Sequence, residues 1–212
     1  MFITFEGVEG AGKSTQLNNL QEYLNKKGLK TIITRQPGGS ELGKQIRNLI
    51  LNPNLNDKPS DLSEMFLYLA DRAHHIEKVI LPALNQGIIV ICDRYIDSHI
   101  AYQGYARGFD IDKLKYLNAI ASKNLIPNIT FLFDLDPVIG LNRVRFGRNQ
   151  DVLDRIESER IEFHQKVREG FLEIAKENNR FKILDASLSQ EEIKKQIIEI
   201  FEYTFSNSIL TA

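Results

Sequence analysis

One glycine-rich stretch near the start of the chain decides its fold: Gly7-Val8-Glu9-Gly10-Ala11-Gly12-Lys13-Ser14. It matches G-x-x-x-x-G-K-S, the pattern of a phosphate-binding loop. Residues 1–5 before it are apolar and β-branched, which indicates a buried strand. After it, Leu17, Leu20 and Leu24 recur at three- and four-residue spacing, which predicts a helix beginning near Lys13. Strand, glycine loop and helix therefore follow one another in the order that this motif requires.

The loop has the chemistry to hold the phosphates of a nucleoside triphosphate. Its three glycines let the backbone turn N–H groups toward phosphate oxygens, and the start of the helix adds about half a positive charge. Lys13 can reach the outer phosphates, and the Ser14 hydroxyl can coordinate Mg²⁺. The motif does not say what becomes of the phosphate, because kinases, ATPases and switches share it.

Composition is typical of an ordinary globular protein. The 212 residues, 42% hydrophobic and 26% charged, suffice for one α/β domain over residues 1–212. The formal net charge of −1 gives no overall attraction to nucleic acid or to an anionic membrane, so we expect neither as a partner. No apolar run approaches the roughly 18 residues of a membrane helix, and the start lacks the pattern of a signal peptide. The single cysteine, Cys92, excludes an intrachain disulfide, and we expect a cytoplasmic protein.

Four further segments are expected to join residues 1–5 in one sheet: 30–34, 88–92, 129–135 and 181–184. Residues 88–92 form a continuous apolar run, which is typical of a central parallel strand buried on both faces. Helical periodicity lies between these segments. The sequence therefore predicts a three-layer α/β fold, with helices on both faces of a five-stranded parallel sheet.

Capping and periodicity predict the helices. Asp61 followed by Glu64 predicts a helix start, and Pro82 is expected to end or kink that helix. Its expected core stripe is Leu62, Met65, Phe66, Leu69, Ala73, Ile76 and Ile80. Two shorter helices are expected to bury Leu42, Ile46, Leu49 and Ile50, and Leu114, Leu117, Ile120 and Ala121. Ser189 and Glu192 are expected to cap the last helix.

Charged residues come directly after two of the predicted strands. Asp93 and Arg94 follow residues 88–92, at the edge where open α/β sheets bind ligands. An aspartate there can orient Mg²⁺ through water, and an arginine can hold a phosphate through two hydrogen bonds. Arg35 and Arg47 could converge on an anion. The alternatives are a structural Asp–Arg pair and two solvated surface charges.

Two pairs of side chains could form a pocket for a base. Tyr68 and Arg72 lie four residues apart, so one can stack on a flat ring while the other donates hydrogen bonds. The alternative is a packed tyrosine and a surface arginine. If residues 96–104 are helical, His99 lies beside Gln103, whose amide offers a donor and an acceptor to a pyrimidine edge. A lone histidine such as His99 is more often structural than catalytic.

Four arginines gather around Gly147: Arg143, Arg145, Arg148 and Arg155. An arginine cluster interrupted by glycine fits a mobile flap over residues 143–155 that closes over phosphates. The alternative is a charged surface helix with Glu157 and Glu159 as neighbours.

Four motifs occur in the order seen in thymidylate kinases: Phe5-Glu6-Gly7 before the glycine loop, Thr34-Arg35-Gln36-Pro37-Gly38-Gly39, Asp93-Arg94-Tyr95 and Ala101-Tyr102-Gln103-Gly104. The chain resembles that family from Phe2 to about Asp185, and Asp154-Arg155-Ile156-Glu157 is similar to its bacterial branch. The resemblance implies a nucleoside monophosphate kinase fold with a phosphate-binding loop. It also implies transfer of the γ-phosphoryl group of ATP to dTMP with Mg²⁺, giving dTDP and ADP in dTTP synthesis, by a homodimer.

The resemblance assigns roles to individual positions. The implied ATP-binding residues are Gly7, Val8, Glu9, Gly10, Ala11, Gly12, Lys13, Ser14 and Thr15. The implied dTMP-binding residues are Arg35, Arg47, Tyr68, Arg72, Arg94, His99, Tyr102 and Gln103. The implied catalytic residues are Lys13, Asp93, Arg94, Arg145 and Arg148. Ser14 and, through water, Asp93 serve the metal. Tyr68 stacks on the base, Arg72 and Gln103 read its edge, and Tyr102 crowds the sugar 2′ position.

This chain differs from some or most members of the family that it resembles at three positions. Some members carry an arginine in the glycine loop where this chain has Gly10, so the transition-state cation is expected to come from Arg145 or Arg148 in the flap. Gln36 replaces the usual glutamate and brings no negative charge to the Mg²⁺ neighbourhood. His99 replaces a small polar residue, and a charge on it near pH 6–7 is expected to make dTMP binding depend on pH.

Two other functions stay open. A kinase for another deoxynucleotide or a deoxynucleoside shares the loop, but a nucleoside kinase needs a carboxylate such as Glu6 or Asp93 to take a hydroxyl proton. A nucleotide-dependent switch or binding module predicts slow hydrolysis, a protein partner and no acceptor. Arg35, Arg47 and Arg94 favour a phosphorylated acceptor, and Tyr68, Arg72 and Gln103 argue against a switch.

Overall fold

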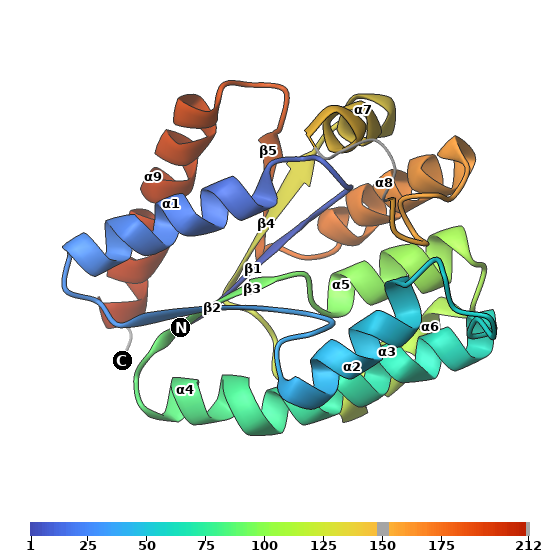
Figure 1. Ribbon diagram of the computed structural model, residues 1–212. Helices are drawn as coiled ribbons and strands as arrows, with labels where there is room; N and C mark the ends of the chain where they lie inside the picture. The colour runs from blue at the N-terminus through green and yellow to red at the C-terminus, as the bar shows by residue number, and fades with distance from the viewer. Residues whose placement is uncertain (148–152, 211–212) are drawn as a thin grey trace.

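Five parallel strands form the centre of the computed structural model, which describes residues 1–147 and 153–210 (Figure 1). Their order across the sheet is β2-β3-β1-β4-β5. The bounds are Phe2–Gly7 (β1), Thr31–Arg35 (β2), Ile89–Asp93 (β3), Ile129–Asp134 (β4) and Phe181–Asp185 (β5). The five predicted strands and their parallel arrangement are therefore confirmed, each to within about two residues at its ends.

Helices cover both faces of this sheet, as the periodicity predicts. Figure 1 shows α1 and α9 together on one side and α4 on the other. The segments α5 and η2 follow β3 and pack against α8. The helices are Lys13–Lys26 (α1), Glu41–Leu51 (α2), Asp61–His75 (α3), Leu81–Asn85 (α4), Ile96–His99 (α5), Ile111–Ala121 (α6), Pro137–Gly147 (α7), Ile161–Lys176 (α8) and Gln190–Leu210 (α9), with π-helical segments Ile76–Ile80 (η1) and Ile100–Ala106 (η2). In the described part of the chain, no helix combines the length and apolar character needed to cross a membrane.

The strand register brings the sequence motifs to one edge of the sheet. Phe5 of β1 pairs with Asp93 of β3, and Asp93 in turn pairs with Arg35 of β2. The glycine loop leaves β1 just beyond this level. Because the carboxyl ends of parallel strands share an edge, the loop and the residues after β3 meet there.

Several helix predictions need correction. Ser60, not Asp61, caps α3, because its hydroxyl accepts the N–H of Ser63, and Glu64 turns inward instead of capping. Pro82 does not end the helix: α3, η1 and α4 follow one another without a break, and Pro82 lies in the first turn of α4. The expected Ser189–Glu192 cap of α9 is confirmed by reciprocal hydrogen bonds.

Some expected core residues face outward. Leu62 and Phe66 of α3 are 54% and 53% exposed, and Ile120 of α6 is 59% exposed. Leu42 and Leu49 of α2 are exposed as well. The apolar stripes are wider than the faces that these helices bury, so spacing alone could not separate inner from outer positions.

One helix was expected only as the alternative to a flap, and another was not predicted. Helix α7 carries Arg143 and Arg145, so the first part of the expected flap is a helix, as the alternative of a charged helix had suggested. Helix α8 buries Phe163, Val167 and Phe171, whose four-residue spacing was a usable signal. The remainder of the predicted flap is described only from residue 153 onward.

Candidate active site

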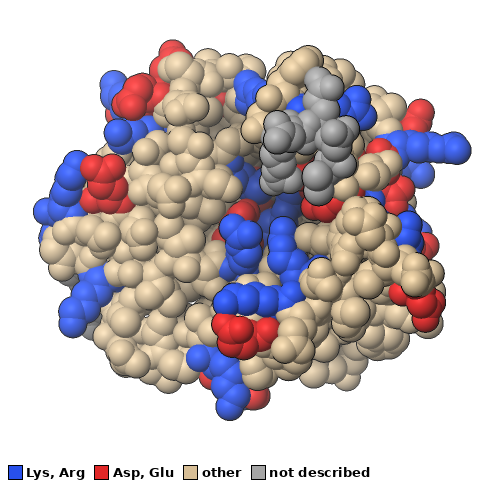
Figure 2. Space-filling view, viewed as in Figure 1, with Lys and Arg blue, Asp and Glu red and all other residues tan. Residues whose placement is uncertain are grey.

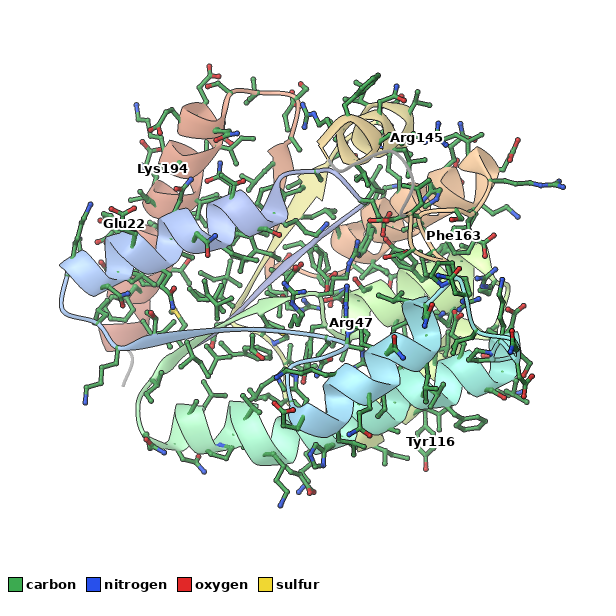
Figure 3. The ribbon with its side chains drawn as sticks, in the orientation of Figure 1. Glu22, Arg47, Tyr116, Arg145, Phe163 and Lys194 are labelled. Atoms are coloured by element: carbon green, nitrogen blue, oxygen red, sulfur yellow. The ribbon has the colours of Figure 1, made fainter. Side chains whose placement is uncertain are left out.

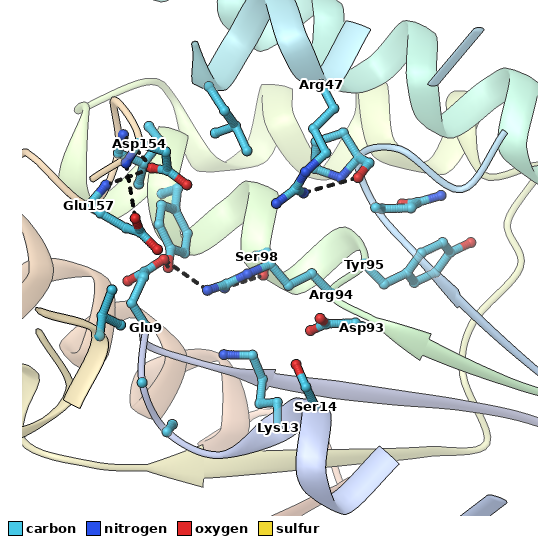
Figure 4. Close-up of a pocket in the computed structure, with 18 of the residues that line it drawn as sticks. Glu9, Lys13, Ser14, Arg47, Asp93, Arg94, Tyr95, Ser98, Asp154 and Glu157 are labelled. Carbon is cyan, nitrogen blue, oxygen red and sulfur yellow. Dashed lines mark hydrogen bonds and ion pairs between the residues drawn. The ribbon is translucent and has the colours of Figure 1, made fainter. Parts of the chain in front are cut away.

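A cavity of about 710 Å³ opens at the carboxyl edge of the sheet. Its walls come from the glycine loop, the turn after β2, helix α3, the end of β3, the α5–η2 segment and α7. Lys13, Arg47, Arg72, Arg94 and Arg143 line it. Figure 2 shows Lys and Arg side chains gathered in a central hollow of the molecule, and Figure 4 shows the groups that line the cavity. The cavity therefore gathers these five cationic side chains beside four carboxylates, those of Glu9, Asp93, Asp154 and Glu157.

The glycine loop holds Lys13 at the floor of this cavity. The Lys13 Nζ donates to the carbonyl oxygens of Gly7 (2.9 Å) and Val8 (2.8 Å), so these two residues position the ammonium while Glu9 to Thr15 line the cavity. Burial and the neighbouring Arg94 charge lower the pKa of Lys13 to about 8. An arriving polyphosphate would offer this ammonium stronger acceptors than the loop carbonyls.

Gly10 is required by close packing of the loop against α7. Its φ is +70°, and a Cβ there would lie 2.0 Å from the carbonyl oxygen of Gly140. No side chain fits at position 10 unless the backbone of the glycine loop or that of α7 at Gly140 moves. The structure thus supports the expectation that the loop itself supplies no arginine.

Asp93 and Ser14 provide groups suited to a hard cation. Figure 4 shows both side chains on the same side of the cavity as Lys13. The Asp93 Oδ1 is buried and has no hydrogen-bond partner in the described part of the chain. No cluster of three or more metal-ligating side chains occurs within residues 1–147 and 153–210. One carboxylate and one hydroxyl fit Mg²⁺, which usually keeps several waters and shares phosphate oxygens.

Arg94 lies close enough to Lys13 to lower its pKa, and it is fixed by several contacts. Its Nη2 donates to Glu9 Oε1 (2.9 Å), its Nη1 donates to Ser98 Oγ (3.1 Å), and its guanidinium lies 5.0 Å from the ring centre of Tyr102. Its backbone adopts a φ of +67°, uncommon for arginine and typical of functional sites. Although burial opposes it, the surrounding Tyr102, Glu9 and Asp93 hold the pKa of Arg94 above its ordinary value. The side chain is therefore a permanent, preoriented cation.

Glu9 connects the glycine loop to this arginine. Besides Arg94, it accepts the hydroxyl of Tyr102 at 2.5 Å, and His164 Nδ1 of α8 lies 3.3 Å from its Oε2. Burial alone would raise the pKa of Glu9, but Arg94 and the hydrogen bonds hold it below the usual range. Glu9 therefore stays an anion that orients Arg94 and Tyr102.

Glu6 supports the turn after β3 from behind. It accepts the N–H of Tyr95 (2.7 Å) and the hydroxyl of Ser98 (2.5 Å). Burial and the nearby Asp97 raise its pKa to about 7. Glu6 is fully buried and does not line the cavity, so it is not placed to take a proton from a bound nucleoside.

The far end of the cavity is built around Arg72. Its Nε donates to Gln36 Oε1 (3.1 Å), its Nη1 to Asn118 Oδ1 (2.6 Å) and its Nη2 to the Tyr95 carbonyl (3.2 Å). Tyr68 faces His99, with ring centres 5.8 Å apart. Gln103 completes this end of the cavity. The alternative of a surface arginine at position 72 is excluded, because this side chain is only 2% exposed.

Gln36 belongs to the arginine network and not to the metal end. Its Nε2 lies 2.9 Å from His75 Nδ1, and His75 Nε2 lies 2.6 Å from Thr34 Oγ1. Burial and Arg72 lower the pKa of His75 to about 4, so this histidine is neutral near pH 7. A neutral amide therefore suits its position between a guanidinium and a neutral imidazole.

The expected charge on His99 near pH 6–7 is contradicted by its surroundings. His99 is 2% exposed, and burial together with Arg72 lowers its pKa to about 3. It stays neutral throughout the range in which a nucleotide would be bound. A pH dependence of dTMP binding cannot come from this residue.

Burial of neutral His99 has a consequence for stability. Because its pKa is about 3 in the folded state and about 6.5 when exposed, the unfolded chain binds more protons between these values. We expect His99→Asn to flatten the loss of unfolding free energy between pH 6 and 4, by up to about 1.4 kcal/mol per pH unit. Urea unfolding at pH 4, 5 and 6 measures this, with His74→Asn as the control for a histidine outside the cavity. Identical slopes in wild type and His99→Asn would contradict the assignment.

Not every predicted site residue lies in the cavity. Arg35 is exposed at the end of β2 and does not line the cavity. It nevertheless lies close to Arg47: burial is the main cause that lowers the pKa of Arg47, and the charge of Arg35 is the second. Arg145 is exposed and does not line the cavity either, whereas Arg143 does, and its Nη1 donates to the Ala186 carbonyl at 3.2 Å. Figure 3 shows Arg145 beside the end of α7. Arg148 lies outside the described residues.

The structure adds residues that the sequence analysis missed. Asn118 and His75 hold Arg72, directly and through Gln36, and His164 contacts Glu9. A signal existed for the first two: Asn118 interrupts the apolar face of α6, and His75 follows Arg72 by three residues. His164 lies next to Phe163 on the buried face of α8, a helix that was not predicted.

Comparisons with known proteins point in one direction. A family model described as Thymidylate kinase matches residues 5–197. The chain is 53% identical over 192 residues to a protein named thymidylate kinase from Carboxydothermus hydrogenoformans, covering 91% of this chain and 92% of that protein. It is 47% identical over 210 residues to the one from Trichodesmium erythraeum, covering 92% of each chain. It also resembles the crystal structure of thymidylate kinase from Ehrlichia chaffeensis, with a TM-score of 0.76, 35% identity and coverage of 95% and 98%.

Proposed function

The chain belongs to the thymidylate kinase family and transfers the γ-phosphoryl group of ATP to dTMP, and we propose that the cavity at the carboxyl edge of the sheet is where it does so. The observation that carries this assignment is that one cavity joins a phosphate-binding loop, a fixed arginine and a pocket for a base. The ends of the Lys13 and Arg94 side chains lie close to each other in this cavity (Figure 4). Donor and acceptor phosphates bound at these groups would face each other.

The two substrates divide the cavity between them. The ATP phosphates bind along the loop from Glu9 to Thr15, with Lys13 at the outer phosphates. The dTMP phosphate binds Arg94, with Arg47 beside it and Arg35 further out. Figure 4 shows Arg47 and Arg94 directed toward the same space. This arrangement concentrates positive charge at the point where the phosphoryl group moves.

The base and the sugar occupy the other end. Tyr68 stacks on the thymine ring, while Arg72 and Gln103 bond to its edge. Tyr102, held by Glu9, lies against the sugar and disfavours a 2′-hydroxyl. His99 narrows this end of the pocket beside Tyr68.

Catalysis then requires positioning and charge neutralisation more than proton transfer. A dTMP phosphate oxygen is ionised at neutral pH, so it can attack the γ-phosphorus in line while ADP leaves. Mg²⁺ would be held by Ser14 and, through water, by Asp93, and would neutralise charge on the transferring group. Because Gly10 leaves no room for a side chain, the remaining cation comes from the flap, with Arg145 and Arg148 as the first candidates and Arg143 as a third.

A panel of acceptors tests the assignment. Phosphoryl transfer from ATP and Mg²⁺ is measured with dTMP, dUMP, dCMP, UMP and thymidine. We expect dTMP to be converted fastest and thymidine not at all, because the acceptor end binds a phosphate. Preference for thymidine would move the function to a nucleoside kinase. ATP hydrolysis without any acceptor would instead favour a nucleotide-dependent switch.

We also propose that the enzyme is a cytoplasmic homodimer. A lone cysteine, which excludes an intrachain disulfide, fits a reducing compartment. The contacting helices α3 and α6 both expose large apolar side chains: Leu62, Phe66, Tyr116 and Ile120 are 54%, 53%, 68% and 59% exposed. Figure 3 shows Tyr116 at the outer side of the molecule. Exposed apolar residues on adjoining helices are typical of an interface between subunits.

A charge placed on this surface is expected to separate the subunits. We expect Phe66→Glu to sediment as a monomer at concentrations where the wild type is a dimer, because burying an unpaired carboxylate in an interface is unfavourable. Sedimentation velocity measures this. Tyr203→Glu, which changes a 75% exposed aromatic residue on α9, is the matched control and should remain dimeric. A dimeric Phe66→Glu protein would place the interface elsewhere.

A further inference from the structure

Glu64 is a fully buried carboxylate that the reaction described above does not use. It lies in the first turns of α3, and its side chain is 0% exposed. A buried carboxylate is tolerated only when cations or donors surround it. Glu64 has such partners: Gln103 of η2 donates to it, and the guanidinium groups of Arg155 and Arg107 approach it.

The hydrogen bond to Gln103 fixes which way that amide points. Gln103 Nε2 donates to Glu64 Oε1 at 2.7 Å. An ionised carboxylate can only accept, so it must face the NH₂ group and not the amide oxygen. The Oε1 of Gln103 is then turned away from Glu64. No donor within the described ranges bonds to this oxygen, and the atom is not fully buried. It is therefore open to the cavity that Gln103 lines.

The two arginines keep this arrangement in place. Arg155 forms an ion pair with Glu64 Oε2, and its own Nε donates to the Ile50 carbonyl at 2.8 Å. Arg107 Nε lies 3.9 Å from Glu64 Oε1, while its Nη2 bonds to Glu159 at 2.6 Å. Both cations are anchored at a second point, so they stabilise the negative form of Glu64 without reaching the cavity. A charged Glu64 permits one orientation of the Gln103 amide.

We propose that Glu64 is a positioning residue for base specificity, which makes Gln103 present a hydrogen-bond acceptor to the N3 position of the bound pyrimidine. The proposal rests on the assignment of the base pocket above. Thymine and uracil carry an N3–H donor, whereas cytosine has an N3 lone pair. A fixed acceptor therefore bonds the first two bases and repels cytosine, and a site built for one hydrogen-bond pattern strongly disfavours the other.

Glu64→Gln tests this by freeing the amide. A glutamine at position 64 can accept from Nε2 or donate to Oε1 of Gln103, so both orientations become possible. We expect the ratio of kcat/KM for dTMP to that for dCMP to fall roughly 10-fold or more, through loss of one matched hydrogen bond. The ratio for dTMP to dUMP should not change, because both bases carry N3–H.

Two further variants separate specificity from general damage. Glu159→Gln removes the carboxylate that accepts from Arg107 Nη2 without touching Gln103, and should keep the wild-type dTMP to dCMP ratio. The exchange Glu64→Gln/Gln103→Glu restores an obligate acceptor at position 103 and should recover selectivity against dCMP.

The outcomes also distinguish this proposal from the assignment of function. A wild-type enzyme that does not phosphorylate dTMP would overturn the function itself. A dTMP-selective wild type whose ratio is unchanged in a folded Glu64→Gln variant would overturn only the role of Glu64. An equal fall of the dTMP to dCMP ratio in Glu159→Gln would also overturn the role of Glu64. The same holds if the exchange variant is as unselective as Glu64→Gln. If Glu64→Gln does not fold, recovery of selectivity in the exchange variant remains decisive, and its absence there overturns the proposal.

Discussion

Arg94→Ala is expected to lower kcat/KM for dTMP by about 10³, the largest effect that we predict for a single side chain outside the glycine loop. The guanidinium is a permanent cation held by Glu9, Ser98 and Tyr102, and we propose that it binds the acceptor phosphate. Its removal takes away a preoriented charge and leaves Glu9 buried without its main cation. Steady-state kinetics with dTMP varied at saturating ATP measures the loss.

Arg94→Lys separates the role of charge from that of geometry. Lysine keeps the cation and so spares Glu9, but it cannot form two parallel bonds to a phosphate. We expect this variant to lose about 10- to 100-fold, mainly through KM. An alanine variant within about 10-fold of wild type, with an unchanged melting temperature, would mean that Arg47 and not Arg94 holds the acceptor phosphate.

The parts of this site that depend on local sequence could be predicted. The spacing from Gly7 to Ser14 determines a loop with few alternatives, and the apolar run before Asp93 places that residue at a strand end. Parallel register then brings the two motifs together, as the pairing of Phe5 with Asp93 in the sheet demonstrates. Proximity followed from topology alone, without knowledge of any side-chain contact.

The parts that depend on which face of a helix is buried could not be predicted in the same way. Glu64 fits a capping pattern three residues after Asp61, yet the cap is Ser60 and Glu64 points inward. Phe66 fits the apolar stripe of α3, yet it faces outward. Both errors have one cause: the buried side of α3 carries polar residues such as Glu64, Arg72 and His75 beside the apolar Met65 and Leu69. The inner face is therefore not marked by apolar character alone.

Contacts between side chains that are distant in the sequence could not be predicted either. The charge expected on His99 was wrong because burial and the charge of Arg72 both lower its pKa. The sequence does not show burial, and Arg72 lies 27 residues earlier in the chain. Gln36 looked like a loss of charge near the metal, but it lies between Arg72 and His75. Its contribution to Mg²⁺ dependence stays a prediction that Gln36→Glu can test.

The pKa of Lys13 leads to a second large effect, on nucleotide binding. Burial and Arg94 lower this pKa to about 8 in the empty site, whereas bound phosphates favour the charged ammonium. Above pH 8 the empty enzyme must therefore take up a proton to bind ATP. We expect the affinity for ATP to be about 10-fold weaker at pH 9 than at pH 7, because only about a tenth of Lys13 is then charged before binding.

Lys13→Met should abolish this pH dependence and, at pH 7, lower kcat by about 10²–10³ through loss of the cation at the outer phosphates. Calorimetric titration of ATP at fixed Mg²⁺, in two buffers of different ionisation enthalpy, measures affinity and proton uptake together. Uptake approaching one proton at pH 9 in the wild type, and none in Lys13→Met, would identify Lys13 as the group. If both proteins weakened equally toward pH 9, the titrating group would be another one, and the loop carbonyls would hold Lys13 as a fully charged ammonium.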